Sequence, residues 1–275
     1  MPHIIAISDP LDPRLDAYTR IRERDLVTGD HFIAEGEVVL RVLLASPRFL
    51  PESVLVAENR IDRLMPLVAG LAEEVPIYRI AQRVLNEIAG FNIHRGILAL
   101  GRRAVAIQAE SLLANAGPGA VVLLLLGIAN HDNIGGIFRN AAGFGAATVL
   151  LDGQSCDPLY RKAVRVSVGA SLLVPFARLD ARTDPLLLLE RFGFQALALS
   201  PRGQISLADF KAQGRVAVIL GTEGPGLPAS ILDRVPSVAI PMAPGFDSLN
   251  VATTSGIVLH HLASGRRAGA QPGSP

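Results

Sequence analysis

The stretch Asn130–Leu151, NHDNIGGIFRNAAGFGAATVLL, joins a polar loop, two glycines and a helix of small residues. An apolar run, Val121–Leu126, precedes this stretch, and a second apolar run, Ala147–Leu151, ends it. Both runs have the length of buried strands. The helix predicted between them carries one charged residue, Arg139. A strand, a polar glycine loop and a helix with a single cation are typical of a site that binds an anion or a nucleotide.

The composition predicts a protein with a large apolar core. The chain has 275 residues, 49% of them hydrophobic, and its mean hydropathy is +0.37. This length suits one large domain or two ordinary ones. No apolar run approaches the roughly 18 residues that a bilayer crossing needs. The first ten residues, MPHIIAISDP, lack the basic start and long apolar core of a signal peptide. We therefore expect a cytoplasmic protein without a membrane segment.

The residues that most often bind metals are sparse. Cys156 is the only cysteine, which excludes a disulfide within the chain and a Cys-rich zinc site. His260 and His261 are adjacent on a predicted helix, so their side chains point in different directions. We expect no metal. Lys162 and Lys211 are the only lysines, so nearly all cations are arginines, which suit phosphate contacts. A GC-rich genome, with its bias toward arginine codons, would explain the same excess.

The first hundred residues alternate between predicted helices and strands, which favours a small α/β sandwich. The predicted helices are 14–24, 38–44, 60–71 and 81–89, and the predicted strands are 31–34, 53–57, 75–78 and 96–100. The loop before the last strand contains Phe91, Asn92, His94 and Arg95. A single histidine in such a loop is usually structural, although an aromatic, an amide and a cation together also suit contact with nucleic acid.

The second half of the chain predicts a parallel sheet, because its strands are continuous apolar runs. The predicted strands are 121–126, 147–151, 195–199, 215–220 and 238–241, and the predicted helices are 136–144, 159–170, 184–192, 228–234 and 250–263. A loose segment, 104–118, is predicted to link the halves. The Gly- and Pro-containing end of the chain, 267–275, is predicted to be disordered.

Polar residues collect after three of the predicted strands, where a parallel sheet binds its ligands. These loops are 130–136, 221–227 and 241–250, and each is rich in glycine or proline. The chain lacks the G-x-G-x-x-G dinucleotide fingerprint, the phosphate-binding P-loop and the G-x-S-x-G nucleophile elbow. A nucleotide-dependent oxidoreductase is therefore disfavoured.

The three loops resemble, in order, the three motifs of the SpoU (TrmH-type) RNA ribose 2′-O-methyltransferases of the SPOUT superfamily. The matching residues are 133–141 with Phe144-Gly145 for motif 1, 220–227 for motif 2, and 240–242 with 248–251 for motif 3. Residues 32–36, FIAEG, resemble the start of the family's substrate-binding extension. His94-Arg95-Gly96 stands where many relatives have His-Gln-Gly.

The resemblance implies an α/β fold with two domains. Residues 1–103 would form an RNA substrate-binding domain with a ribosomal-protein-L30e-like fold. Residues 104–118 would be the linker, and 119–266 a parallel-sheet SpoU methyltransferase domain tied in a deep trefoil knot. The family works as a homodimer through the knotted domain and uses S-adenosyl-L-methionine as its cofactor.

The resemblance also nominates five catalytic residues, Asn133, Arg139, Glu223, Ser248 and Asn250. Arginine is effectively always protonated, so Arg139 is better suited to clamp a phosphate and stabilise alkoxide charge than to act as a base. The proton would leave through Glu223 or water. Simpler roles remain open: Asn133, Ser248 and Asn250 as helix caps, and Glu223 as a carboxylate that holds loop amides.

Six further residues are predicted to bind the cofactor through apolar walls and backbone contacts: Leu199, Gly221, Gly226, Ile240, Met242 and Leu249. Their alternative roles are plain core packing and tight turns. The predicted function is transfer of a methyl group to a ribose 2′-OH of rRNA or tRNA. A catalytically inactive RNA-binding protein and a knotted base methyltransferase are the alternatives.

Overall fold

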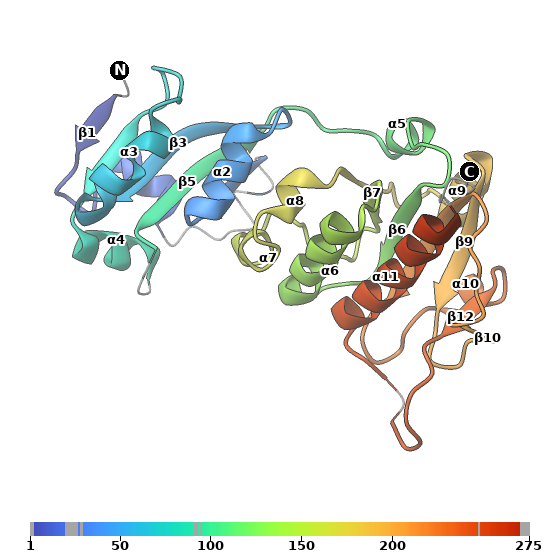
Figure 1. Ribbon diagram of the computed structural model, residues 1–275. Helices are drawn as coiled ribbons and strands as arrows, with labels where there is room; N and C mark the ends of the chain where they lie inside the picture. The colour runs from blue at the N-terminus through green and yellow to red at the C-terminus, as the bar shows by residue number, and fades with distance from the viewer. Residues whose placement is uncertain are drawn as a thin grey trace, which may run out of the picture. The chain divides into compact units, whose positions relative to one another are not determined.

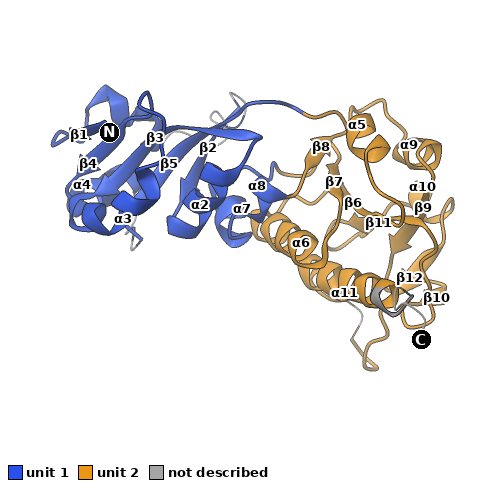
Figure 2. Ribbon diagram, turned by 45° about the horizontal axis from the view of Figure 1, so that its top comes forward, with its two compact units in different colours: residues 1–106, 157–173 blue, residues 107–156, 174–275 orange. Residues whose placement is uncertain are grey.

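The chain folds into two compact units (Figure 2). The computed structural model describes residues 3–19, 27, 30–90, 93, 95–246 and 248–269. Unit 1 comprises residues 1–106 and 157–173, and unit 2 comprises residues 107–156 and 174–275. The segment 157–173 lies inside the range predicted for the methyltransferase domain, yet its contacts group it with unit 1. The chain therefore passes between the units three times.

Unit 1 is built on a five-stranded mixed sheet. The strand order is β1 (Ile4–Ala6), β4 (Ile77–Ile80), β3 (Phe49–Ala57), β5 (Ile97–Arg103), β2 (His31–Glu35). Strands β1, β4 and β3 run parallel to one another, whereas β5 pairs antiparallel with both β3 and β2. The helices are η1 (Pro13–Tyr18), α2 (Glu37–Ala45), η2 (Glu58–Arg60), α3 (Ile61–Val68), α4 (Gln82–Ala89), α7 (Arg161–Val166) and α8 (Ala170–Leu173). The four strands predicted between residues 31 and 100 are all present.

One helix predicted in unit 1 differs from the element in the structure. Residues 14–24 were predicted to be α-helical, but the structure has a 3-10 helix at Pro13–Tyr18 that ends at Thr19, whose backbone is extended. The rest of that prediction, 20–24, lies outside the described residues, as do Phe91, Asn92 and His94. Tyr18 makes the short helix part of the core: its buried hydroxyl lies 2.7 Å from Ser53 Oγ and accepts a bond from the Leu100 amide.

Specific contacts explain why the segment 157–173 belongs to unit 1. Arg165 Nη1 of α7 lies 3.8 Å from the buried carboxylate of Glu35, at the end of β2. Arg48 Nη2 donates to the Leu172 carbonyl of α8 at 2.8 Å. Partial burial, together with the charge of nearby Arg103, lowers the pKa of Arg48 to about 10.

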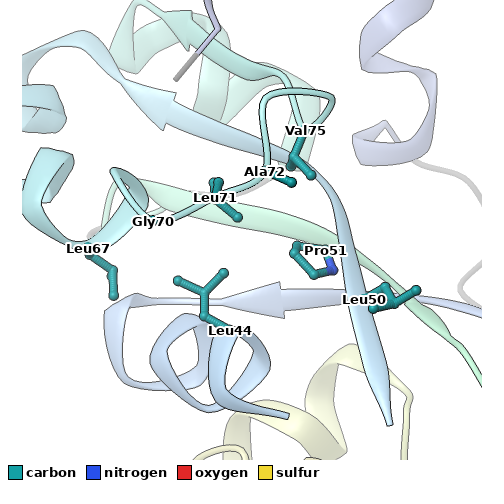
Figure 3. A pocket seen from close by; sticks show the side chains of 8 residues that line it. All are labelled: Leu44, Leu50, Pro51, Leu67, Gly70, Leu71, Ala72 and Val75. Carbon is teal, nitrogen blue, oxygen red and sulfur yellow. The ribbon is translucent and has the colours of Figure 1, made fainter. Parts of the chain in front are cut away.

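Unit 1 also contains an apolar pocket of about 530 Å³ (Figure 3). It is lined by Leu44, Leu50, Pro51, Leu67, Gly70, Leu71, Ala72 and Val75. None of these side chains is polar, whereas pockets that bind small ligands usually combine apolar walls with a few convergent polar groups. The pocket therefore offers no side chain that can act on a substrate.

Unit 2 is built on a seven-stranded sheet in which every pairing is parallel. The strand order is β10 (Ile205–Ser206), β12 (Ser237–Ala239), β9 (Phe194–Leu199), β11 (Arg215–Gly221), β6 (Val121–Leu126), β7 (Thr148–Leu151), β8 (Phe176–Arg178). The predicted parallel sheet is thus confirmed. Strands β8 and β10 were not predicted, because two or three residues are too few to show a pattern.

Helices cover both faces of this sheet (Figures 1 and 2). The helices of unit 2 are α5 (Ala109–Ala114), α6 (His131–Phe144), α9 (Pro185–Arg191), α10 (Ala229–Leu232) and α11 (Val251–Gly269). Helices α5, α9 and α10 contribute to one apolar cluster with the sheet. Helices α6 and α11 pack against each other on the opposite face.

The predicted linker contains helix α5, whose Ala109 and Leu113 are buried in the core cluster. Two predictions about the second half of the chain need correction. The helix predicted at 159–170 is split into α7 and α8, because Val168 and Gly169 adopt positive φ angles of 55° and 82°. Helix α11 extends three residues into the predicted tail, and 270–275 lie outside the described residues.

Two negative findings apply to the described ranges. No helix there has both the length and the apolar composition that a bilayer crossing requires. The same residues contain no group of three or more His, Cys, Asp or Glu side chains placed to hold a metal ion.

The substitution Gly136→Ala tests the close packing of α6 on α11. A Cβ at Gly136 would lie 2.7 Å from Ala252 Cβ, so Gly136→Ala has to push the two helices apart. We expect a loss of about 1–3 kcal/mol in the free energy of unfolding, measured by chemical denaturation. Gly143→Ala, on the same helix, is the control, because a Cβ at Gly143 would have no atom within 4 Å. This variant should have an unchanged free energy of unfolding or gain up to about 1 kcal/mol. Equal stabilities for the two variants would contradict the packing described here.

Candidate functional site

The three loops predicted to form the site meet at the carboxyl edge of the parallel sheet. Strands β6 and β11 are neighbours, and their last residues, Leu126 and Gly221, are paired in register. The chain continues from β6 to β7 on one side, while β9 and β11 lie on the other side. Open parallel sheets bind ligands beyond the carboxyl ends of the strands, at the point where the strand order reverses in this way.

The loop after β6 is capped by Asn130. Its Oδ1 accepts a bond of 2.8 Å from the Asp132 amide, so α6 begins at His131, five residues before the predicted start. This corrects the alternative role suggested for Asn133. Asn133 lies inside the first turn of α6, where it is only 5% exposed, and so it is not the helix cap. Its side chain is available for contacts with the other loops.

Asn133, Glu223 and Asn250 form a hydrogen-bonded group that we call the amide–carboxylate triad. Asn133 Nδ2 donates to Glu223 Oε1 at 2.8 Å. Asn250 Nδ2 donates to the same Oε1 at 3.0 Å and to Asn133 Oδ1 at 2.8 Å. Each member comes from a different loop, so one carboxylate oxygen ties together segments that are 90 and 117 residues from Asn133 in sequence.

Asn250 has two roles at once. Its Oδ1 accepts bonds from the Ala252 and Thr253 amides at 2.9 and 3.2 Å, which makes it the cap at the start of α11. Its Nδ2 belongs to the triad. The capping role therefore holds for Asn250 but does not exclude a role in the site. Glu223 holds the side-chain amides of Asn133 and Asn250, which agrees with the structural role suggested for this carboxylate.

The other two nominated catalytic residues lie outside the triad. Arg139 is exposed on α6, and its guanidinium has no hydrogen-bond or ion-pair partner among the described residues. It can therefore receive an anionic ligand without first breaking a contact within the protein. Ser248 is exposed two residues before Asn250.

The residues nominated for cofactor binding follow neighbouring strand ends. Leu199 ends β9, Gly221 ends β11 and Ile240 follows β12. The remaining three, Gly226, Met242 and Leu249, belong to the loops after β11 and β12, and Leu249 is 37% exposed. The six residues thus lie in loops or strand ends at the same edge as the triad, and none of them is fully buried in the core.

The loop after β11 is a tight turn that requires glycine. The Gly226 amide donates to the Thr222 carbonyl at 3.2 Å, which closes the turn. A Cβ on Gly221 would lie 2.7 Å from the backbone of Gly226 and Leu227. Gly226 has a φ of 72°, a conformation that favours glycine. These glycines therefore fix the loop that carries Glu223.

A fourth loop, after β7, was missed in the sequence. Asp152 accepts bonds from the Gly127 amide at 3.0 Å and from the Ser155 amide at 2.8 Å, and Ser155 Oγ accepts one from the Ile128 amide at 3.0 Å. These contacts hold the start of the loop that leads to α6. Asp152 directly follows a strand, so applying the strand-end rule to β7 as well would have found it.

Asn140, in the motif 1 segment 133–141, connects two helices, a role that the sequence did not predict. Its Nδ2 donates to the Ala252 carbonyl at 2.7 Å and to Ser255 Oγ at 3.0 Å, so it binds α6 to the first turns of α11. Because α6 carries Arg139 and α11 begins at Asn250, this pair of bonds fixes the helix of the first loop relative to the third.

The comparison with known protein families decides the assignment. The sequence profile of the SpoU rRNA Methylase family matches residues 120–260, about half of the chain. The chain belongs to the SpoU rRNA methylase family. The matched range contains all five residues nominated as catalytic and all six nominated for cofactor binding.

Relatives of this SpoU chain match it over nearly its whole length. An uncharacterized tRNA/rRNA methyltransferase of Mycobacterium bovis is 38% identical over 94% of each chain. The 23S rRNA (guanosine-2′-O-)-methyltransferase RlmB of Photobacterium profundum is 26% identical over 86% of this chain and 95% of its own. The crystal structure of an AdoMet-bound rRNA methyltransferase from Sinorhizobium meliloti superposes with a TM-score of 0.82, at 19% identity, over 98% of this chain and 99% of that one. At that identity the superposition establishes a shared fold.

Glu223→Ala tests whether the triad holds the SpoU site together. The change leaves the amide of buried Asn133 without its carboxylate acceptor, which should cost about 1–3 kcal/mol in the free energy of unfolding. Glu223→Gln keeps a carbonyl acceptor of the same size and should cost less than half as much. Thermal and chemical denaturation of both variants check this. A full loss in Glu223→Gln, or none in Glu223→Ala, would contradict the structural role of the triad.

Proposed function

We propose that this SpoU-family protein is an S-adenosyl-L-methionine-dependent RNA methyltransferase that methylates a ribose 2′-OH in rRNA or tRNA. The observation that carries the proposal is the amide–carboxylate triad at the strand-order reversal of a parallel sheet, with Arg139 exposed on the helix that carries Asn133. The names of the relatives, which include a guanosine-2′-O-methyltransferase, support the same reaction class.

The residues at the strand ends fit S-adenosyl-L-methionine. An adenine ring needs a flat apolar slot, and Leu199, Ile240 and Leu249 offer partly exposed apolar side chains there. An adenosine also needs backbone donors and acceptors at close range. Gly221 and Gly226, which lack side chains, let the chain after β11 approach a ligand closely.

The proposed cofactor supplies an electrophilic methyl group bound to a sulfonium. The residues of this chain have to place the ribose hydroxyl in line with that methyl group and help it lose its proton. When bound, S-adenosyl-L-methionine would supply this methyl group to the hydroxyl oxygen, and its sulfur would keep the electron pair of the broken carbon–sulfur bond. The proton of the hydroxyl leaves to Glu223 or to water.

Arg139 contributes a positive charge and does not act as a base. A guanidinium remains protonated at physiological pH, so it cannot accept the proton of the hydroxyl. It can bind a phosphate of the RNA in a bidentate manner and stabilise the negative charge that develops on the ribose oxygen. Asn133 and Asn250 position the carboxylate of Glu223 through the triad. Ser248 stays a candidate for contact with the substrate.

The proposal includes three architectural features that the family resemblance implies. Unit 2 would contain a deep trefoil knot and would form a homodimer. The N-terminal part of unit 1 would be an L30e-like domain that selects the RNA.

The decisive experiment is a methyl-transfer assay with labelled S-adenosyl-L-methionine. Total tRNA, naked rRNA and ribosomal subunits are offered separately to the purified protein. Transfer to a ribose 2′-OH makes the adjacent phosphodiester resistant to alkali, so the label should appear in a dinucleotide of one RNA class. Label confined to a base would favour the base-methyltransferase alternative. Failure to bind the cofactor would favour an inactive RNA-binding protein.

Arg139→Ala should lower the transfer rate by about 10²–10³-fold, because it removes a charged donor from the transition state. Arg139→Lys keeps the charge but loses the planar fork, and should recover only a small part of that rate. Arg182→Ala, at another exposed arginine far along the chain, is the control and should retain the full rate. Cofactor affinity, measured by calorimetry, should be similar in all variants. Full turnover in Arg139→Lys would refute the bidentate role.

A further inference from the structure

Two arginines of unit 1 lie directly against the backbone of two glycines. A Cβ on Gly36 would lie 2.7 Å from Arg95 Cδ and 3.0 Å from Arg95 Nη1. A Cβ on Gly96 would lie 2.8 Å from Arg60 Cγ. Both glycines have positive φ angles, 94° and 66°, which strain any other residue. The arginine side chains therefore occupy space that exists only because these two positions lack side chains.

The two glycines are neighbours in the fold, although they are 60 residues apart in sequence. The Gly36 amide donates to the carbonyl of Ile97, the residue after Gly96, at 3.1 Å. The Gly96 carbonyl accepts from the Ala57 amide at 2.9 Å, next to the segment that carries Arg60. The same bonds join the end of β2, the start of β5 and the end of β3. Arg60 and Arg95 thus lie against backbone segments that are hydrogen-bonded to one another, and Gly36 directly precedes α2.

Among the residues that the structure describes, neither Arg60 nor Arg95 makes a hydrogen bond or an ion pair through its guanidinium. Glu58 and Asp62, the acidic neighbours of Arg60 in sequence, are not within ion-pair distance of it.

Other arginines nearby behave differently. Arg41 donates to Glu37 at 2.8 Å, and Arg63 lies 3.5 Å from the other oxygen of the same carboxylate. The region therefore contains two arginines that are ion-paired with Glu37 and two that are not. Solvent-accessible cations without an ion-pair partner attract anions, and the attraction is stronger where the side chains are already held in place.

We infer that Arg60 and Arg95 form a phosphate-binding site for the backbone of the RNA substrate; this inference rests on the proposed function. The guanidinium fork matches a phosphodiester in a bidentate manner. The site is open, with Arg95 exposed and Arg60 half-buried, which suits a polymer that passes across a surface better than a small enclosed anion. Because phosphate contacts carry no base information, this site would position the RNA and leave the choice of nucleotide to other residues.

The test is the salt dependence of RNA binding by the full-length protein. Fluorescently labelled total tRNA and transcribed rRNA fragments are titrated with the protein between about 50 and 200 mM salt. Arg60→Gln and Arg95→Gln should each lower the slope of log affinity against log salt by about 0.7–0.9, the value of one lost phosphate contact, and the double variant should lose about twice that. Arg41→Gln is the matched control, because its charge is already compensated by Glu37, and its slope should match that of the unaltered protein.

The outcomes separate this inference from the proposed function. Slopes that fall in the two test variants but not in Arg41→Gln support the site, even if no methyl transfer is found with any RNA. Equal decreases in all three variants would mean diffuse attraction and overturn it. Unchanged slopes in a protein that methylates RNA would also overturn it, while leaving the enzymatic proposal intact. Thermal melting and cofactor affinity should be unaltered in the test variants, which excludes a loss of folding as the cause.

Discussion

A single carboxylate oxygen, Glu223 Oε1, accepts two hydrogen bonds, and the site depends on this interaction. Its donors, Asn133 and Asn250, come from the first and third loops, and Glu223 comes from the second. The sheet brings these loops to one edge, but an edge alone leaves each loop free to move. The triad removes that freedom, because the amide of Asn133 is buried and its lack of an acceptor would be costly.

Two further sets of contacts stabilise the loops and helices around Glu223. Glycines at 221 and 226 set the turn that presents Glu223, and Asp152 and Ser155 hold the backbone where the first loop leaves β6. Farther out, α6 and α11 are bonded to each other through Asn140. Arg139 is the exception, since it is exposed and the described residues give its guanidinium no partner. The helix that the triad and Asn140 hold in place thus carries a cation that is available for an anion.

The sequence predicted most of this arrangement, and the misses have physical causes. Continuous apolar runs identified the parallel sheet, and its strand ends identified Glu223 and Asn250. The start of α6 was placed too late, because Gly135-Gly136 looks like a loop, whereas Asn130 caps the helix earlier. The break between α7 and α8 depends on a positive φ at Val168, which a β-branched residue gives no reason to expect. The contacts of Arg60 with Gly96 and of Arg95 with Gly36 join residues far apart in sequence, so no local sequence pattern predicts them.

The excursion of residues 157–173 limits how this protein can be divided. Strands β7 and β8 are neighbours in the sheet of unit 2, yet the chain between them packs on unit 1 through Arg165, Leu172 and Gly169. No continuous stretch of sequence therefore encodes either unit completely. A gene fragment ending near residue 106 would lack two of the helices of unit 1, and the remaining fragment would carry those helices without the surface they cover. Exchange of the N-terminal part between related proteins would consequently require matching changes in the middle of the chain.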